Sequence, residues 1–174
     1  RPEDARGALE HVFSVQPADE RVRERLRTLY AATGADRELA VILLADAEAT
    51  ADVPARFEAL RRAGELLVRS GDPGAALTPL VAAYDLKSDD HELTIALVDA
   101  YTATGAHAEA GQLLEVAIAA QGKRRTPELA TLQHRMAKLA GAAGARETEF
   151  EWYKVALDSD KNNGDIAADL ADLS

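Results

Sequence analysis

Glycine at a nearly fixed interval is the feature that most limits what this chain of 174 residues can fold into. Gly71 and Gly105 lie 34 residues apart, and Gly34 and Gly144 continue the series at intervals of 37 and 39 residues. Each glycine ends an apolar stretch and is followed by a polar turn. A period of this length is typical of repeat proteins, in which each unit buries its apolar face only against its neighbours.

Apolar residues within each unit recur at spacings of three and four, which is the period of an α-helix. Leu60, Ala63 and Leu67 form one such series, and Gly71 follows where a left-handed residue would end the helix. Shorter second helices are predicted over residues 74–86 and 108–120. No stretch has the alternating, β-branched pattern of a strand. Each unit is therefore predicted to be a helical hairpin.

Particular residues predict where helices begin and bend. Asp89 lies three residues before a glutamate, a carboxylate version of the capping box at the start of a first helix. Thr126 and Pro127 are typical of an N-cap and a first helical residue. The five inserted residues 125–129 are therefore expected to lengthen the next helix by about one turn. Pro79 lies inside a predicted second helix, and we expect a local kink that faces outward.

The pattern resembles the tetratricopeptide repeat, a helix-turn-helix family with a period of 34 residues. The matching residues are Leu60, Ala63, Gly64, Leu67, Ala76, Leu80 and Ala83 in one unit and Leu97, Val98, Tyr101, Ala110, Leu114 and Ala117 in the next. The resemblance extends over essentially the whole chain. It implies an all-α fold, a right-handed superhelix built from antiparallel helix pairs.

Repeat boundaries follow from the same alignment. The chain 1–174 is expected to be a single repeat domain and a piece of a longer array. Full repeats are predicted over 20–56, 57–90, 91–129 (with the inserted loop) and 130–163. Residues 1–19 would be the second helix of a partial repeat, and residues 164–174 the first helix of a further one.

Some residues depart from the family pattern. Thr94 and Gln133 are polar at the fourth position of their repeats, where an apolar residue is expected. Glu149 stands at the twentieth position, where a small alanine lets the two helices approach. A buried carboxylate without a partner is costly. We therefore expect either that this hairpin opens locally or that Glu149 reaches solvent or an arginine.

The resemblance also implies a binding surface, because first helices of this family line the concave face. The positions of the first helices that face this concave groove hold Arg21, Glu24, Thr28, Arg61, Glu65, Arg69, Ile95, Asp99, Thr102, His134 and Lys138. This mixture of charges and a few apolar residues suits an extended peptide or a partner helix. The alternative for any single residue is an ordinary solvated helix face, as in a pairing of Arg61 with Glu65 one turn away. The lysine and asparagine clamp of the members that bind chaperone tails is absent.

Composition and motifs disfavour other classes of protein. The chain carries 30 acidic and 20 basic residues, and its net charge of −10 disfavours nucleic acid as a partner. There is no cysteine, no catalytic motif and no apolar run of the roughly 20 residues that insertion into a membrane needs. Asp158, Asp160 and Asn162 have the spacing of a calcium loop, but the required glycine is displaced, so we interpret them as a linker. We expect no catalytic residue, no metal and no cofactor.

The sequence therefore predicts a non-catalytic protein-protein interaction scaffold that binds a peptide or partner protein on its concave face. We expect it to be part of a larger bacterial protein, with the cytoplasm as the default location and the envelope as an alternative. A structural spacer that self-associates through exposed solenoid ends, or an accessory module of an enzyme elsewhere in the parent chain, is the alternative function. Residues 123–125 form a basic loop, interpreted as solvated, and Trp152 is expected to pack at a repeat junction.

Overall fold

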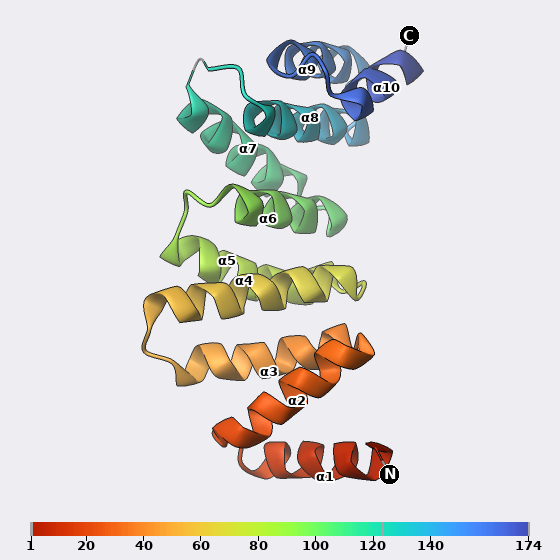
Figure 1. The fold of residues 1–174 in the computed structure, drawn as a ribbon. Coiled ribbons are helices and arrows are strands. Elements are labelled where there is room, and N and C mark those ends of the chain that lie inside the picture. The colour runs from red at the N-terminus through yellow and green to blue at the C-terminus, as the bar shows by residue number, and fades with distance from the viewer. Residues whose placement is uncertain (1, 123, 174) are drawn as a thin grey trace. The chain divides into compact units, whose positions relative to one another are not determined.

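The computed structural model describes residues 2–122 and 124–173, which form ten helices and no strand (Figure 1). The helices are α1 (Pro2–Val15), α2 (Glu20–Thr33), α3 (Asp36–Ala49), α4 (Val53–Arg69), α5 (Pro73–Leu86), α6 (His91–Ala103), α7 (His107–Gln121), α8 (Pro127–Ala142), α9 (Arg146–Ser159) and α10 (Gly164–Asp172). The predicted all-α class of antiparallel helix pairs is confirmed. Arg1, Lys123 and Ser174, which belong to predicted segments, lie outside the described residues.

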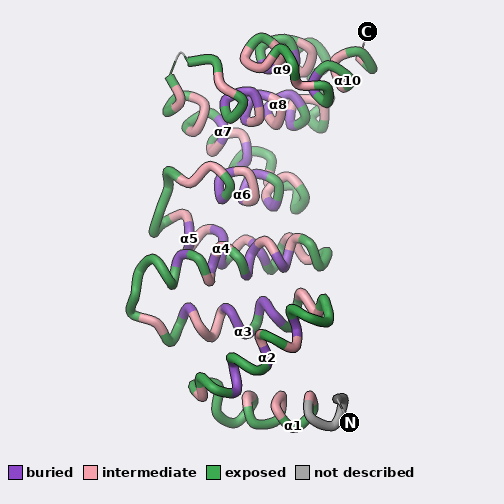
Figure 2. The backbone as a smooth tube through the Cα atoms, in the orientation of Figure 1, coloured by how far each residue is buried: buried purple, intermediate pink, exposed green. Residues whose placement is uncertain are grey.

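The chain divides within α6 into two compact units, one ending at Ala96 and one beginning at Leu97. In the first unit α1 packs on α2, α2 on α3, α3 on α4, and α4 on α5. In the second unit α7 packs on α8, α8 on α9, and α9 on α10. Buried residues lie along the helix faces that meet (Figure 2). Each unit therefore has its own core of neighbouring helices.

The four regularly spaced glycines end first helices as predicted. Their φ angles lie between +68° and +84°, in the left-handed region. At Gly71 the following N–H, that of Asp72, donates to the carbonyl of Leu67 at 2.9 Å. This 6→1 hydrogen bond of the Schellman motif satisfies a carbonyl at the end of α4, and the chain then turns into α5. The same bond recurs after the other three glycines.

Close approach of α4 and α5 depends on a second kind of glycine. A Cβ atom built on Gly64 would lie far inside van der Waals distance of the Leu80 side chain. Leu80 is fully buried, as are Ala63, Ala76 and Ala83 around it. Small residues on both helices thus make room for one large one, which is how this hairpin reaches the close packing of a protein interior.

Two expectations about helix geometry are wrong. The cap of α6 is Asp90, not Asp89: the helix begins at His91, and Asp90 Oδ1 accepts the N–H of Leu93 at 3.0 Å. Pro79 lies inside α5 as expected, but it is buried rather than facing outward. It stands three residues after buried Ala76 and four before buried Ala83, a spacing that places all three on the inner face of the helix.

Other helix starts agree with the sequence. Thr126 Oγ1 accepts the N–H of Leu129 at 3.1 Å, so α8 begins at Pro127, a turn before the repeat boundary at 130. Helix α4 also begins before its repeat boundary, at Val53, behind the N-cap Asp52.

The polar residues at apolar repeat positions find local partners. Thr94 is buried and donates to the carbonyl of Asp90 at 2.9 Å. Gln133 is buried and accepts a hydrogen bond from Ser159 at 2.7 Å. Glu149 is half-buried with its carboxylate directly over Gly141, where no Cβ would fit. Helices α8 and α9 stay packed, so this hairpin does not open.

Candidate functional site

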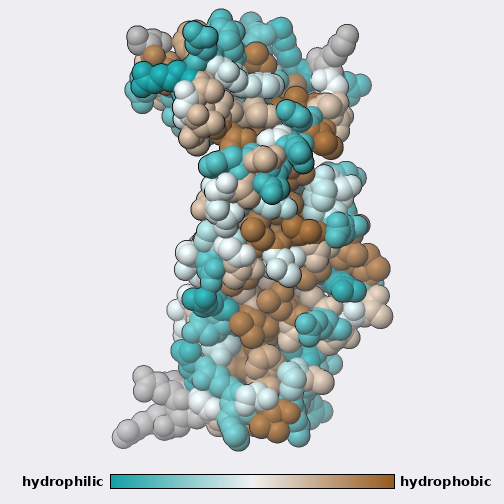
Figure 3. Space-filling view, turned by 180° about the vertical axis from the view of Figure 1, so that it is seen from behind, coloured by the Kyte–Doolittle hydropathy of each residue, from teal (hydrophilic) through white to brown (hydrophobic). Residues whose placement is uncertain are grey.

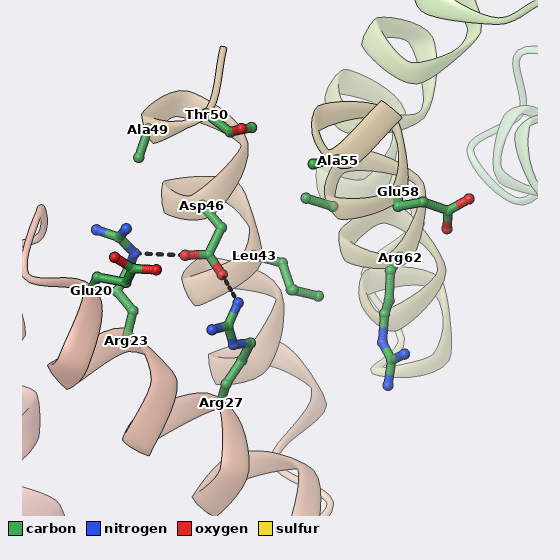
Figure 4. A pocket seen from close by; sticks show the side chains of 11 residues that line it. Glu20, Arg23, Arg27, Leu43, Asp46, Ala49, Thr50, Ala55, Glu58 and Arg62 are labelled. Atoms are coloured by element: carbon green, nitrogen blue, oxygen red, sulfur yellow. Dashed lines mark hydrogen bonds and ion pairs between the residues drawn. The ribbon is translucent and has the colours of Figure 1, made fainter. Parts of the chain in front are cut away.

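A cleft lies between α2 and α4 of the first unit, with α3 as its floor (Figure 4). The cleft consists of two adjoining cavities, and the larger one has a volume of about 550 Å³. The lining residues are Glu20, Arg23 and Arg27 of α2, Leu43, Asp46 and Ala49 of α3, Thr50, and Ala55, Glu58, Ala59 and Arg62 of α4. Alanines at three of these positions keep the space open.

Asp46 connects two arginines across the rear of this cleft. Arg23 Nε donates to Asp46 Oδ1 at 2.6 Å, and Arg27 Nη1 donates to Oδ2 at 2.7 Å (Figure 4). Arg23 is only 6% exposed, and its Nη1 also donates to the carbonyl of Pro17 at 2.7 Å. The carboxylate is therefore neutralised by two charge-assisted pairs that hold α2 to α3.

A second cavity of about 300 Å³ adjoins the first and shares Arg27, Leu43 and Arg62 with it. Its other lining residues are Glu24, Thr28, Ala31 and Leu39. We call the two cavities together the α2–α4 cleft. Along α2 the cleft extends from Glu20 to Ala31, which is about 16 Å at 1.5 Å per helical residue. An extended peptide of about five residues has the same length.

Arg62 differs from the other arginines of the α2–α4 cleft. It is exposed on the α4 side and makes no hydrogen bond or ion pair with the described part of the chain. Arg23 and Arg27 both contact Asp46 instead. Arg62 is therefore the guanidinium of the cleft whose donors are available to a ligand.

The predicted surface residues of the first unit have two kinds of surroundings. Thr28 and Glu24 line the α2–α4 cleft, while Arg21 lies with Glu24 around a separate shallow cavity on α2. Thr28 Oγ1 donates to the carbonyl of Glu24 at 3.0 Å. Glu24 also pairs with Arg27.

The other predicted residues of this unit lie outside the cleft lining. Arg61 bridges Glu58 at 2.9 Å and Glu65 at 2.5 Å along its own helix, and the hydrogen bond to Glu58 raises the pKa of Arg61 above its usual value. Arg69 donates twice to Asp36, at 2.5 and 2.7 Å, which lowers the pKa of that carboxyl.

The predicted surface residues of α6 and α8 mostly contact neighbouring helices. Asp99 accepts two hydrogen bonds from Arg135, at 2.8 and 2.9 Å. Thr102 Oγ1 donates to the carbonyl of Val98, and Ile95 is half-buried. Asp99 thus joins α6 to α8, while Thr102 binds a carbonyl of its own helix.

His134 and Lys138 converge on one carboxylate of α10. His134 Nε2 lies 2.7 Å from Asp169 Oδ2, and Lys138 Nζ lies 3.3 Å from the same oxygen. The hydrogen bond to the His134 imidazole is the largest cause of a lowered pKa of Asp169. Tyr153 packs against the imidazole ring, and burial raises the pKa of its phenol to about 12. The cluster fastens α10 to α8.

Two further sequence features have structural roles. Arg125 of the basic loop pairs with Asp158 at 2.6 Å, and Asn163 caps α10 through the N–H of Ile166.

No group of three His, Cys, Asp or Glu side chains among the described residues could hold a metal ion. Trp152 is half-buried against the core of α8, α9 and α10, so its expected place at a repeat junction is confirmed. None of the described helices is long and apolar enough to span a membrane.

Sequence reasoning missed Arg23, Arg27, Asp46 and Arg62. A signal was present for Arg23, because it occupies the fourth position of its repeat, where a charge needs a buried partner. Asp46 follows it by 23 residues on the next helix. Arg62 lies at a position that the family pattern assigns neither to the core nor to the binding surface, so no signal marked it.

Comparison with known proteins agrees with this architecture. A family model described as tetratricopeptide repeat matches residues 67–136. The solved structure of YrrB, a TPR protein with an unusual peptide-binding site, is 17% identical, with a TM-score of 0.72 over 98% of this chain and 83% of that one. TTC0263, a TPR protein of Thermus thermophilus, is 19% identical, with a TM-score of 0.60 over 95% of this chain and 86% of that one.

PilF of Pseudomonas aeruginosa is 16% identical, with a TM-score of 0.57 over 98% of this chain and 74% of that one. No curated protein sequence matches the chain significantly. The glycine-punctuated hairpins, the family match in their centre and the fold similarity along the chain agree with one another. Residues 67–136 therefore match the tetratricopeptide repeat family, and nearly the whole chain has the fold of tetratricopeptide repeat proteins.

Proposed function

We propose that this protein is a non-catalytic scaffold that binds an extended segment of a partner protein on the face lined by its first helices. The tetratricopeptide fold is generally a protein-protein interaction scaffold. The observation that carries the finer proposal is the α2–α4 cleft, which is as long as about five extended residues. Its mixture of apolar and hydrogen-bonding side chains can contact both the backbone and the side chains of a peptide.

The similarity to YrrB supports the same assignment, because that protein has a peptide-binding site on a related fold. Of the predicted surface residues, Glu24 and Thr28 contribute directly to the α2–α4 cleft. Arg61, Glu65 and Arg69 extend the first-helix face of this unit. In the second unit Asp99, Thr102, His134 and Lys138 belong to the proposed surface as well.

Filling the cleft tests the proposal. Ala55→Trp adds a large side chain to the lining of the larger cavity, on an exposed position near the start of α4. The probe is a random octapeptide library displayed on phage, with each peptide fused through its C-terminus. We expect the natural chain to enrich a family of peptides and Ala55→Trp to enrich none of them.

Ala108→Trp is the matched control, because Ala108 is exposed on α7 and lines none of these cavities. Circular dichroism should show the same helicity for both variants. If the library yields no enriched peptide, or if Ala55→Trp binds the same peptides as Ala108→Trp, the cleft is not a peptide site.

Exposed apolar side chains favour self-association as a second function. Val15 is 65% exposed at the end of α1, and Val116 of α7 is 62% exposed. On α9, Trp152 and Val155 line a mostly apolar surface hollow of about 340 Å³. Figure 3 shows apolar side chains reaching the surface on the side opposite to that of Figure 1. Such patches pair readily between molecules.

Light scattering over a range of protein concentration tests this alternative. Self-association predicts a molar mass that rises with concentration and a smaller rise in a Val116→Glu variant. A mass equal to that of one chain at every concentration would contradict it.

A further inference from the structure

Successive first helices of the second unit are joined by ion pairs at the same two repeat positions. With repeats beginning at residues 91, 130 and 164, the ninth residue of one repeat meets the sixth residue of the next. Asp99, a ninth residue, accepts from Arg135, a sixth residue, at 2.8 and 2.9 Å. Lys138, a ninth residue, lies 3.3 Å from Asp169, a sixth residue.

The junction between α2 and α4 has only half of such a pair. With repeats beginning at 20 and 57, Arg62 is the sixth residue and Thr28 is the ninth residue opposite it. Thr28 turns its hydroxyl to the carbonyl of Glu24 on its own helix. Both residues line the cavity of about 300 Å³ described above. An arginine thus faces a cavity at the place where the equivalent arginine, Arg135, faces a carboxylate.

The charges around this cavity leave Arg62 as the group that needs a partner. Arg27 also lines the cavity, but Asp46 and Glu24 already neutralise it. Among the residues that line this cavity, Glu24 carries a carboxylate, and its pairing with Arg27 limits its competition for Arg62. A guanidinium has planar, forked donors that fit one carboxylate with two parallel hydrogen bonds.

We propose that an aspartate or glutamate side chain of the bound partner segment occupies the place beside Arg62 that Asp99 occupies beside Arg135. This inference rests on the proposed peptide-binding function of the α2–α4 cleft and specifies the chemistry of its ligand. The partner segment therefore carries an acidic residue at a fixed position in its register within the cleft. Its remaining residues run along α3 between the two first helices.

The octapeptide library tests the inference because its C-terminal fusion leaves side chains as the carboxylates of each peptide. We expect the natural chain to enrich peptides with Asp or Glu at one aligned position. Arg62→Gln should lose that preference and bind a selected peptide about 10- to 150-fold more weakly, as loss of a charged hydrogen bond implies. Arg56→Gln, an exposed arginine of the same helix outside the cleft lining, is the matched control and should bind normally.

Two further measurements test the same contact by changing the residue opposite Arg62 and the peptide itself. Thr28→Asp places a carboxylate where the second unit has Asp99. The new carboxylate should pair with Arg62 within the protein and weaken binding of the peptide by a similar factor. Replacing the acidic residue of the peptide by glutamine should weaken binding to the natural chain and have little effect on Arg62→Gln.

The outcomes separate this inference from the function on which it rests. Enriched peptides without an acidic position, or equal binding by the natural chain and Arg62→Gln, overturn the inference and leave the cleft a peptide site. Loss of the acidic preference in Arg56→Gln as well would also overturn it, because the effect would then follow net charge. If Ala55→Trp abolishes the binding of none of the enriched peptides, both proposals are overturned.

Discussion

Asp46→Ala would leave two guanidinium groups on α2 without the carboxylate that both contact. Arg23 is the more affected, because its side chain is only 8% exposed and that of Asp46 is 17% exposed. Removing one partner of a buried ion pair typically costs about 3–5 kcal/mol, because the remaining charge stays in a poorly solvated place. Arg27 is 34% exposed and Arg23 keeps the carbonyl of Pro17, so we expect a loss of about 3 kcal/mol.

Amide hydrogen exchange in α2 and α3 is the appropriate assay, since it reports the local free energy of opening separately from the second unit. The slowest amides of these two helices should exchange about 150-fold faster in Asp46→Ala, which corresponds to the expected loss of about 3 kcal/mol. Amides of α8 and α9, in the other unit, serve as the internal reference and should be little changed.

A double variant distinguishes loss of the ion pair from loss of packing. Arg23→Met with Asp46→Leu removes both charges and keeps most of the volume, and such replacements are often neutral. Its exchange rates should therefore lie close to those of the natural chain. If Asp46→Ala changes exchange less than fivefold, or if the double variant is as unstable as Asp46→Ala, the pair does not hold α2 to α3.

Further perturbations probe close packing and acid sensitivity. Gly64→Ala should destabilise the first unit by about 1–3 kcal/mol in urea unfolding, because its Cβ would overlap the buried Leu80 side chain. Gly111→Ala, whose Cβ would be in ordinary contact at 3.6 Å, should stabilise the chain by about 0.5–1 kcal/mol, and equal effects of the two would refute this reasoning. Asp169 has a lowered pKa in the folded chain, so its contribution to stability is present above the ordinary carboxyl pKa of about 3.9 and is lost as the pH falls through the folded value. Fluorescence of Trp152, which packs in the same cluster as α10, should therefore differ between the natural chain and Asp169→Asn at pH 6 and converge in acid, and a constant difference would contradict the assignment.

The repeat and its turns could be predicted from the sequence because their causes are local. Gly71 requires a positive φ that few other residues tolerate, and its effect is visible in a window of a few residues. The errors are also local. Asp89 and Asp90 are adjacent carboxylates, and only the exact start of α6 decides which one caps it. The disruption of helices by proline predicts that Pro79 faces outward, yet its spacing from Ala76 and Ala83 places it on the buried face.

The candidate site could be predicted only in part, because its important pairs join residues of different helices. Thr28 is marked by its position on a first helix, but nothing in its own repeat shows that Arg62 lies opposite. The pairing of Arg23 with Asp46 likewise depends on how α2 crosses α3. A family pattern describes which positions face the core. It does not describe which side chains meet where two helices pack together.

Compensation between facing helices explains why this chain tolerates residues that break the family pattern. Glu149 is too large for its position, and Gly141 on the facing helix gives it the missing space. Gln133 is polar in the core, and Ser159 satisfies it. Both departures are thus matched by a residue on the neighbouring helix, as expected when stability is a sum of contacts between neighbours. Arg62 breaks no position of the family pattern, but the facing helix supplies no matching charge for it, and a partner that supplies a carboxylate there gains electrostatic complementarity and hence specificity.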